Sequence, residues 1–547
     1  MMRLPMLVEI AAALVIWGLI ATASRRVRLG QVSTWSGWLI RYPLRSVVAI
    51  GILSGLLSVG LTNYRGIPVP MTHDEFSYLL AGETYAQGRL TNPPHPFWRH
   101  FEAMHIIQQP TRMSKYPAGQ GAVLAIGNLL SGRPVVGVWL SLSLASMAIG
   151  WMLLAWLPIR WALLGTFCAA LRMVGSEWGN GYWGGAVAAA GGALLLGALR
   201  RLADRPDWRG GALFGTGLVI LANSRPYEGL VVACASGLVL AVAWWRLRPF
   251  HGGMHVLHVT VPAFLVVLAG AAAMGISNAA VTGNAWQMPY QAHDSQYAGC
   301  PTFLFQTPGP LPEYRHADME GYFSGWERNR FVRKHVGWGF NLSYFTKLRV
   351  FLEFFIGPAL LVPYLMMVPF PAAFWPRSAW LIIAAALLGA TQTLYLFPHY
   401  LAPVTGLVWF VVVLGARRLA ACRIRGFRQP ALIVSLLVAA GAGPLIDATD
   451  DSRSRSIRGN LAERLLTEPG RDLVLLDFGP DYDFHESWVY NAADLDESPI
   501  VWARSLGDEA DAGLRGYYAD RRAWRVSVGY RTAILMPDER TASLPAP

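Results

Sequence analysis

The segment THDEFSYLLAGETYAQGRLTNPPHP, from Thr72 to Pro96, is a polar stretch in a chain built mostly of apolar runs. It opens on two adjacent carboxylates, Asp74 and Glu75, and apolar or aromatic residues recur behind them at the spacing of a short amphipathic helix. An Asn-Pro-Pro turn signal closes the stretch. The segment therefore predicts a helix just outside a bilayer, with both carboxylates in its first turn.

The composition around this segment is that of a membrane protein. The chain of 547 residues is 54% hydrophobic and 15% charged, whereas roughly 25% of the residues in soluble proteins are charged. Since apolar runs recur along most of the chain, we predict a polytopic α-helical membrane protein with about 12–13 transmembrane helices. A shorter run rich in small residues, at 118–131, is either a full crossing or a re-entrant helix. The other runs lie at 5–23, 44–62, 134–157, 161–174, 183–199, 211–224, 229–245, 256–277, 351–369, 378–397, 400–416 and 430–447.

We interpret the formal net charge of +12 as a sign of membrane topology. Arg residues cluster in short connectors, and no nucleic-acid-binding motif accompanies them, so no nucleic acid partner is expected. The positive-inside rule places these basic connectors in the cytoplasm; they are the segments 25–45, 200–209, 246–248 and 417–428.

The polar segments then gather on the opposite, extracytoplasmic face if 118–131 does not cross the membrane. This convergence predicts a membrane-embedded site that opens outward. If 118–131 does cross, the N-terminal run must take the opposite orientation or form a re-entrant helix. The predicted sides of the other segments do not change. The polar segments are 63–117, 176–181, 223–229, 278–350, 398–400 and everything after about 448.

The four cysteines indicate neither a disulfide framework nor a zinc site, because Cys168 and Cys234 lie in apolar runs and no Cys-x-x-Cys occurs. The first apolar run has only Arg3 before it, and its basic residues follow it. We therefore interpret this run as a retained membrane anchor rather than a signal peptide.

The last hundred residues change character, since carboxylates become frequent and long apolar runs stop. Strand patterns begin at Asp472 (DLVLLDFG) and Pro499 (PIVWARSLG), a helix begins at Asp508, and the strand pair WRVSV and TAILMP follows. We predict a transmembrane domain at 1–447, with outer loops at about 63–117 and 278–350, and a small extracytoplasmic α/β domain at 448–547.

Asp74 and Glu75 are the first candidates for chemistry. A partly desolvated carboxylate at a membrane boundary can act as a general base, bind a metal or pair with a cation. The same two residues also suit a helix N-terminus, where carboxylates interact favourably with the helix dipole. Lys115, which ends the same loop, can neutralise a phosphate or simply snorkel to the interface.

Other polar residues lie in the predicted outward turns. Arg225 in NSRPYEG can make bidentate contacts to a phosphate or pair with Glu228 within its turn. Glu177 in GSEWGNGYWGG stands among glycines, for which close helix packing is the preferred explanation. His399 and Tyr400 in LFPHYLAPV can contact a phosphate or a sugar, although a structural His and an interfacial Tyr fit equally.

Two further features leave their alternatives open. The loop at 278–350 is rich in aromatic and polar residues, which suit either carbohydrate binding or interfacial anchoring. Four histidines with nearby carboxylates could hold a divalent metal, but their spacings match no metal motif, so no metal ligand is assigned. They are His73, His95, His100 and His105.

Taken in order, these motifs resemble those of the GT-C superfamily of membrane glycosyltransferases, and more closely the branch with the protein O-mannosyltransferases and the lipid A aminoarabinose transferase. Asp74-Glu75 followed by Tyr78 is similar to the acidic motif of their first outer loop. Lys115-Tyr116-Pro117 is similar to the Lys-Pro-Pro element that ends that loop, with Tyr in place of the first Pro. The segment 399–403, HYLAP, resembles their late Tyr-x-x-Pro element, with His where relatives often carry Arg. The resemblance covers most of 44–420.

The resemblance implies an inverting glycosyltransferase of the cytoplasmic (inner) membrane. It would move a sugar from a polyprenyl-phosphate donor to a lipid, glycan or protein acceptor on the extracytoplasmic side. Asp74 would be the general base, and Glu75 would support or share that role. Because a lipid phosphate leaves well, no cofactor is required, and a divalent metal is left open. The resemblance assigns the donor phosphate to Lys115, Arg225, His399 and Tyr400, and the acceptor or sugar to Tyr78, Glu177 and Glu228.

Two other classes of protein fit parts of the sequence. A transporter or lipid-binding protein would use the acidic pair for coupling, but transporters place ionisable residues within helices and show internal repeats. Here the ionisable residues lie in predicted outer loops, and no repeat is visible. A structural assembly protein that docks through its C-terminal domain explains the tail but not the convergent polar loops.

Overall fold

The computed structural model describes residues 37–247, 253–367, 373–421, 437–438, 441 and 456–538. By its contacts the chain forms two compact units, each assembled from three segments. The segments 66–137 and 274–336, which contain most of the two predicted outer loops, belong to the same unit as the residues from 451 onward. The first unit comprises Met1–Arg65, Val138–Ala273 and Gly337–Asp450.

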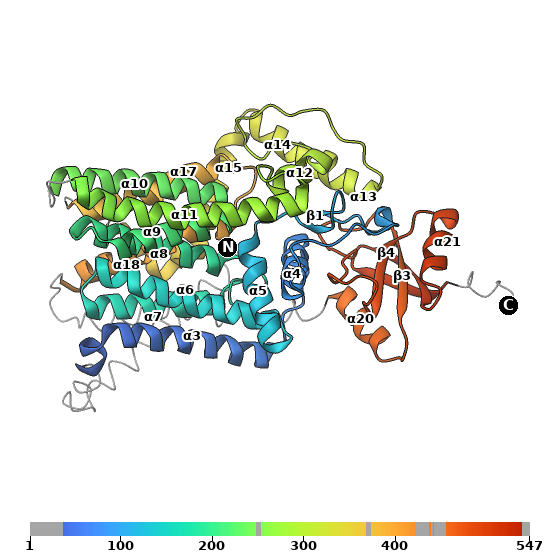
Figure 1. The fold of residues 1–547 in the computed structure, drawn as a ribbon, viewed down its shortest axis with the longest axis horizontal. Coiled ribbons are helices and arrows are strands. Elements are labelled where there is room, and N and C mark those ends of the chain that lie inside the picture. Colours follow the sequence, from blue (N-terminus) through green and yellow to red (C-terminus); the bar gives the residue numbers. More distant parts are fainter. Residues whose placement is uncertain are drawn as a thin grey trace. The chain divides into compact units, whose positions relative to one another are not determined.

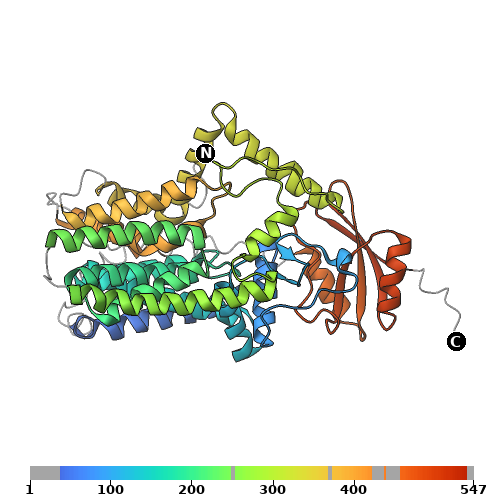
Figure 2. The ribbon, with the colours of Figure 1, turned by 45° about the horizontal axis from the view of Figure 1, so that its top comes forward.

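Helices make up the described part of the first unit, and the long ones run side by side as a bundle (Figures 1 and 2). A π-helical stretch, η3, and a 3₁₀ stretch, η4, interrupt the regular helices. The elements are α3 (Pro43–Arg65), α6 (Val135–Trp156), α7 (Ile159–Gly175), α8 (Gly185–Asp204), α9 (Trp208–Ala222), α10 (Pro226–Leu247), α11 (Gly253–Thr282), α15 (Gly339–Phe351), η3 (Leu352–Ile356), α16 (Gly357–Leu365), α17 (Phe374–Thr391), η4 (Pro398–Val404) and α18 (Thr405–Ala421).

Eight helical stretches within the described residues are long and apolar enough to cross a membrane, and each overlaps a predicted run. The chain is therefore a multi-pass membrane protein, as predicted. The predicted runs at 5–23 and 430–447 lie outside the described residues, apart from 437–438 and 441. The eight stretches are Pro43–Arg65, Val135–Trp156, Gly185–Asp204, Pro226–Arg246, Val256–Thr282, Asn341–Leu365, Phe374–Thr391 and Ala402–Ala421.

The run at 118–131 forms a single helix, α5 (Ala118–Ser131), of 14 residues. At 1.5 Å per residue it is roughly 21 Å long, which is less than the ~30 Å of hydrocarbon that a crossing must span. It belongs to the second unit and packs against α4 (His73–Ala86). Of the two alternatives that the sequence left open, α5 fits the one in which this run does not cross.

α8 and α11 place their apolar residues in different environments. α8, rich in Gly and Ala, is buried along most of its length, and Gly192 lies so close to η4 that a Cβ there would meet the Pro403 carbonyl oxygen at 1.9 Å. The glycines thus serve packing, as predicted, and bring η4 against the bundle core. α11 instead exposes large apolar side chains, as expected of a helix that faces lipid; they include Leu257, Phe264, Leu265 and Leu268.

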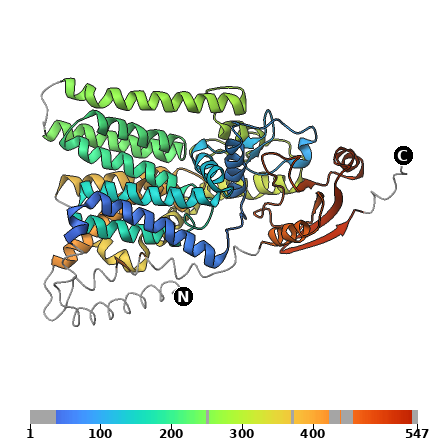
Figure 3. The ribbon, with the colours of Figure 1, turned by 60° about the horizontal axis from the view of Figure 1, so that its bottom comes forward.

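The second unit contains a four-stranded sheet with the strand order β4-β3-β5-β6. The strands of this sheet are drawn in orange and red in Figure 3. β3 pairs in parallel with both β4 and β5, and β5 pairs antiparallel with β6. The predicted α/β character of the C-terminal residues is confirmed. The elements are β3 (Asp472–Phe478), β4 (Ile500–Arg504), β5 (Arg522–Gly529), β6 (Thr532–Pro537), α20 (Ile457–Leu466) and α21 (Asp508–Tyr517).

The successive apolar residues of β3 contribute to two hydrophobic cores, because neighbouring side chains in a strand point to opposite faces. Val474 and Leu476 belong to a core that also contains Leu465 of α20 and Leu80 of α4. Leu473 and Leu475 belong to another core, with Leu514 of α21. The helix that begins with the acidic pair is therefore part of the hydrophobic core of the sheet.

The remaining elements of this unit are short. They come from the two predicted outer loops and include a β-hairpin of two-residue strands. They are η1 (Trp98–Phe101), β1 (Ile106–Ile107), β2 (Met113–Ser114), α12 (Pro289–Tyr297), α13 (Ala317–Glu320), the π-helical η2 (Gly321–Glu327) and α14 (Arg328–His335).

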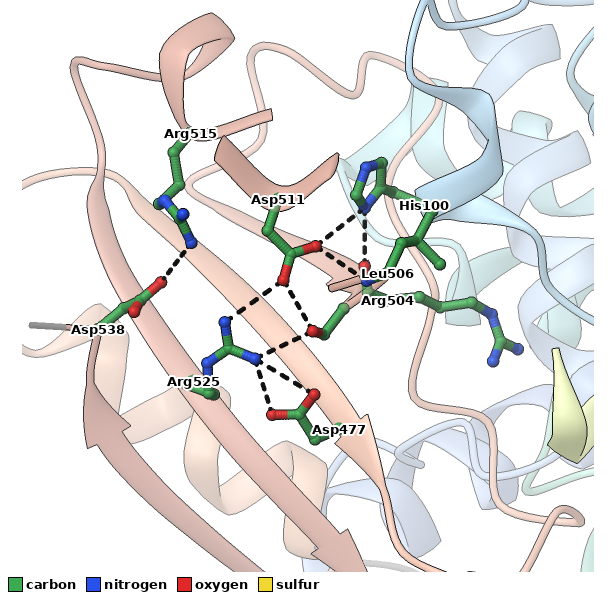
Figure 4. Close-up of polar contacts among 9 residues, drawn as sticks. His100, Asp477, Arg504, Leu506, Asp511, Arg515, Arg525 and Asp538 are labelled. Atoms are coloured by element: carbon green, nitrogen blue, oxygen red, sulfur yellow. Dashed lines mark hydrogen bonds and ion pairs between the residues drawn. The ribbon is translucent and has the colours of Figure 1, made fainter. Parts of the chain in front are cut away.

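A buried carboxylate, Asp511, organises polar contacts at one face of the sheet (Figure 4). It is fully buried and accepts hydrogen bonds from Leu506 N at 2.9 Å and Ser505 Oγ at 2.7 Å. Arg525 lies 3.3 Å away as its charge partner, and His100 Nδ1 lies 3.7 Å away. Arg525 also pairs with Asp477 at 3.0 Å, so the loss of Asp511 would leave chiefly Leu506 N and Ser505 Oγ without their buried acceptor. Each donor left unsatisfied costs about 1–3 kcal/mol.

We expect Asp511→Ala to lower the free energy of unfolding of the second unit by roughly 3 kcal/mol. Thermal unfolding of the purified protein in detergent, with proteolysis of the C-terminal residues as a second probe, measures the effect. Glu497→Ala is the matched control, because its ion pair with Arg471 is solvent-exposed, with side-chain exposures of 68% and 42%. Such pairs contribute about 1 kcal/mol or less. Equal shifts for the two variants would contradict the structural role of Asp511.

Candidate active site

α4 begins at the acidic pair, and its first turn shows how the two carboxylates differ. Thr72 precedes the helix in an extended conformation, with φ −99° and ψ 155°. The buried Glu75 carboxylate reaches back over this start, accepting hydrogen bonds from Met71 N at 3.2 Å and Thr72 Oγ1 at 3.4 Å. Glu75 therefore stabilises the helix start in the manner of a capping-box carboxylate.

Asp74 lies differently, because its side chain keeps 24% exposure. Its Oδ1 accepts a short hydrogen bond from Tyr116 Oη, and His105 Nδ1 lies 3.6 Å from the same oxygen. Tyr116 Oη and His105 Nδ1 are themselves 3.1 Å apart. Asp74, Tyr116 and His105 thus form a compact triangle of polar groups, which we call the Asp74 cluster.

Aromatic rings hold the Asp74 cluster in place. The Tyr116 ring stacks on Tyr78 at a centroid distance of 4.5 Å and meets the edge of Tyr290 at 5.4 Å. The ammonium of Lys115 lies 5.5 Å from the centroid of the Tyr116 ring. The structure therefore brings three residues predicted for the site together within the second unit: Asp74, Tyr78 and Lys115.

His105 in the cluster and its neighbours His73 and His293 are buried, and burial keeps all three imidazoles neutral. Burial is the main cause that lowers the pKa of His73 and of His293 to about 4. The pKa of His105 falls well below its ordinary value because of burial first, and then because of the charge of Lys115 and the neighbouring histidines. Neutral imidazoles offer hydrogen bonds rather than charge at neutral pH.

The four histidines proposed from sequence for a metal do not gather in one place. His73 and His105 are neighbours, with ring centroids 5.7 Å apart, whereas His95 lies against Tyr518 and His100 against the Arg504 carbonyl oxygen. Within the described parts of the chain, no three His, Cys, Asp or Glu side chains are placed to hold a metal ion.

The segment between β3 and β4 contacts the start of α4 through two polar interactions. His73 Nε2 lies 2.6 Å from the Phe484 carbonyl oxygen, across 411 residues of sequence. Ser487 N donates to the Met71 carbonyl oxygen at 3.3 Å, just before the helix. The residues that flank Asp74 are therefore anchored to the C-terminal part of the chain.

The same segment also holds the far end of α4. The Glu83 carboxylate accepts hydrogen bonds from Tyr490 Oη at 3.0 Å and from Ala493 N at 2.9 Å. Between the two ends of α4, the half-buried Arg458 of α20 places its guanidinium 5.1 Å from the ring centroid of Phe76. The C-terminal sheet unit is therefore a structural support for the helix that carries Asp74.

The predicted phosphate-binding residues Arg225, His399 and Tyr400 gather in the first unit. The buried Arg225 follows α9, and its guanidinium lies 4.9 Å from the ring centroid of Tyr400 in η4. His399, also in η4, stacks on Trp183 at a centroid distance of 4.9 Å. Among the described residues, no group forms a hydrogen bond with His399 Nδ1.

The surroundings of His399 determine its charge. Burial, and then the positive charge of Arg225, lower the pKa of His399 well below its ordinary value. The imidazole is therefore neutral at neutral pH and acts as a hydrogen-bonding group. Arg225 supplies the positive charge of this group of residues.

Glu177 and Glu228 also lie in the first unit. Glu177 is half-buried in the turn between α7 and α8, next to the fully buried Trp178. Glu228 is buried in the first turn of α10, where its carboxylate interacts electrostatically with Arg225. Glu228 thus neighbours Arg225, and the contact of both acids with an acceptor or sugar stays a prediction.

Sequence reasoning missed several residues around these groups. The sequence patterns mark Tyr116 only as a departure from a motif and His105 only as one of four scattered histidines, and they single out neither His293 nor Trp183. The signal for Tyr116 was its place next to Lys115. Nothing local marks His293, because it enters from another loop.

The fold and these residues define a multi-pass helical membrane protein that carries a mixed α/β sheet unit and a carboxylate–tyrosine–histidine cluster. No protein-family model and no curated protein sequence matches the chain. Among solved structures it is similar to ArnT from Cupriavidus metallidurans bound to undecaprenyl phosphate, with 14% identity and a TM-score of 0.47 over 90% of this chain and 93% of that one. The same protein in the apo state gives 13% identity and a TM-score of 0.48, with the same coverage.

The chain is also similar to the archaeal oligosaccharyltransferase AglB from Archaeoglobus fulgidus in complex with an inhibitory peptide and a dolichol-phosphate. Here the identity is 11% and the TM-score 0.41, over 90% of this chain and 70% of that one.

Proposed function

We propose that this protein is an inverting glycosyltransferase that uses a polyprenyl-phosphate sugar, with Asp74 as the general base. The observation that carries the proposal is the state of the Asp74 carboxylate. It is partly exposed, one oxygen is held by Tyr116, and a second oxygen is left to meet a substrate. A general base needs this combination of fixed orientation and access.

In the proposed reaction, Asp74 takes the proton of an acceptor hydroxyl or amine as that group attacks the anomeric carbon of the donor sugar. The new bond forms between the acceptor and the anomeric carbon, and the bond from that carbon to the phosphate oxygen breaks. The polyprenyl phosphate departs with the bonding electron pair. A single displacement of this kind inverts the anomeric configuration.

Glu75 supports this reaction indirectly in the proposal. Its contacts with Met71 and Thr72 fix the helix start from which Asp74 projects. Tyr78 lies behind Asp74, stacked on Tyr116, and shapes the acceptor side. The division of labour between the two carboxylates thus favours Asp74 as the proton acceptor.

Arg225 and Lys115 are proposed to bind the phosphate, with His399 and Tyr400 adding neutral hydrogen bonds. Negative charge grows on the phosphate as the bond to the sugar breaks, and fixed cations that stabilise this charge lower the barrier. A lipid phosphate is already a good leaving group, so the proposal requires no cofactor, although a divalent metal would be compatible with it. That these residues and Asp74 serve one substrate is a prediction from the sequence.

The proposed enzyme works in the cytoplasmic membrane and transfers the sugar on the extracytoplasmic side. The apolar helices offer the polyprenyl chain an apolar environment, and the acceptor is a lipid, a glycan or a protein. The positive-inside distribution of Arg residues and the placing of Asp74 in a predicted outer segment support this orientation.

A doubly labelled donor separates this proposal from transport. Polyprenyl-phosphate sugar with one label on the lipid and another on the sugar is presented to the protein in vesicles that also contain a membrane lipid extract as acceptor. A transferase moves the sugar label to a new product and leaves the lipid label as polyprenyl phosphate. A transporter or lipid-binding protein keeps both labels on one molecule, and that result would remove the proposed function.

A further inference from the structure

We propose that Tyr116 and His105 are positioning residues, which orient Asp74 through a directed chain of hydrogen bonds. This inference rests on the proposed function of Asp74 as general base. It adds two side chains that act on the base and not on the substrate.

The direction of the chain follows from what each group can donate. An ionised carboxylate only accepts, so the Tyr116 hydroxyl must donate its single proton to Asp74 Oδ1. The Tyr116 oxygen then has only acceptor capacity left for His105 Nδ1, which is 3.1 Å away. His105 Nδ1 must therefore carry the hydrogen, and this assigns the tautomer of the neutral imidazole.

The backbone around His105 supports a dedicated role. His105 adopts a left-handed conformation with φ +64°, which is uncommon for residues other than Gly, although His, like Asn and Asp, adopts it more often than most. Its carbonyl oxygen is fixed by Ser77 Oγ at 2.7 Å and by Lys115 N at 3.2 Å. These bonds connect His105 both to α4 and to the residue that precedes Tyr116.

Five titratable groups face His105, and they come from α4, the end of the loop and α12. His73 and Asp74 approach from α4, Lys115 and Tyr116 from the end of the loop, and His293 from α12. Burial, Lys115 and the two other histidines all disfavour a positive charge on His105. Tyr322 of η2 adds an uncharged ring edge at 6.2 Å.

The hydrogen bond from Tyr116 gives the two oxygens of the Asp74 carboxylate different roles. With Oδ1 occupied by Tyr116, the carboxylate cannot rotate freely, and Oδ2 is the oxygen that receives the acceptor proton. Fixing the reacting oxygen matters because a misplacement of about 1 Å can reduce a rate by roughly a hundredfold.

Tyr116→Phe is the first test, since it removes the hydroxyl and keeps the ring that stacks on Tyr78. We expect kcat to fall about 10- to 100-fold while KM for the donor changes less than about threefold. The acidic limb of the pH–rate profile should move to higher pH, because a carboxylate that loses a hydrogen-bond donor binds its proton more tightly. Tyr85→Phe in α4 is the control, because the Tyr85 hydroxyl interacts with Ser277 and not with Asp74. Neither kcat nor the pH–rate profile should change in this variant.

Two His105 variants separate the loss of the hydrogen-bond donor from an effect on the backbone conformation of residue 105. Both His105→Gly and His105→Asn tolerate the left-handed backbone, but only Asn keeps a donor near the place of Nδ1. We expect Asn to retain most of the activity and Gly to reproduce the loss seen in Tyr116→Phe.

Two results would overturn the inference. One is a Tyr116→Phe enzyme with unchanged kcat and an unchanged pH profile, and the other is equal activity in the Gly and Asn variants. If Asp74→Asn is inactive in the same assay, such results remove only the positioning role. If Asp74→Asn keeps full activity, the proposed function of the carboxylate fails independently.

Discussion

Asp74→Asn should lower sugar transfer about a hundredfold to ten-thousandfold, the range that general acid–base catalysis contributes. The amide has almost the size of the carboxylate and can still accept a hydrogen bond from Tyr116 through its oxygen, so the local fold should persist. It cannot take a proton from the acceptor. Initial rates with a labelled polyprenyl-phosphate sugar, in vesicles that hold equal amounts of inserted protein, measure the change.

The matched comparison is Glu75→Gln, the neighbouring change of the same chemical kind. The Glu75 carboxylate contacts Met71 N and Thr72 Oγ1, so its amide variant should weaken the helix start and reduce transfer only about tenfold. If Asp74→Asn transferred sugar at the wild-type rate, Asp74 would not be the base. If Glu75→Gln were the more damaging change, the roles of the two carboxylates would be exchanged.

Arg225→Ala should weaken binding of polyprenyl phosphate by about 30-fold or more. The loss of a buried charged partner for an anion costs roughly 2–5 kcal/mol, and Arg225 is the buried cation beside Tyr400 and His399. Arg225→Lys should recover part of the affinity, because it keeps the charge but not the bidentate geometry. Native mass spectrometry of the detergent-solubilised protein with polyprenyl phosphate, and with polyprenol as the uncharged competitor, measures this.

Arg209→Ala is the control for this prediction. Arg209 is exposed near the start of α9, whereas Arg225 follows the end of the same helix, so the two variants remove the same charge from opposite ends. Arg209→Ala should leave lipid binding unchanged. If both variants bind polyprenyl phosphate as the wild type does, Arg225 does not belong to a phosphate site.

The fold could be predicted from the sequence because its signals are local. Length and apolarity mark the spanning helices, and the continuous apolar run of β3 marks a strand buried on both faces, as Leu473 and Val474 show in their separate cores. The crossing question for 118–131 needed the structure, since the length of the helix and its packing on α4 are not fixed by the sequence pattern alone.

The site was predictable only in part, because its geometry is made by residues far apart in sequence. Asp74 and Lys115 could be chosen by residue type and position. The Tyr116 hydroxyl on Asp74, the left-handed His105 and the neutral state of His399 depend on tertiary packing and burial, which no local pattern records. The same is true of the support that α4 receives from the segment between β3 and β4.

The anomeric configuration of the product tests the central claim most directly, because it reports whether Asp74 acts as a base or a nucleophile. A polyprenyl-phosphate sugar of known configuration is transferred to an acceptor from a membrane lipid extract, and NMR coupling constants define the configuration of the purified glycoside. A single displacement assisted by Asp74 predicts the opposite configuration to that of the donor. A retained configuration would require a covalent glycosyl-enzyme or an equivalent double displacement and would contradict the general-base account.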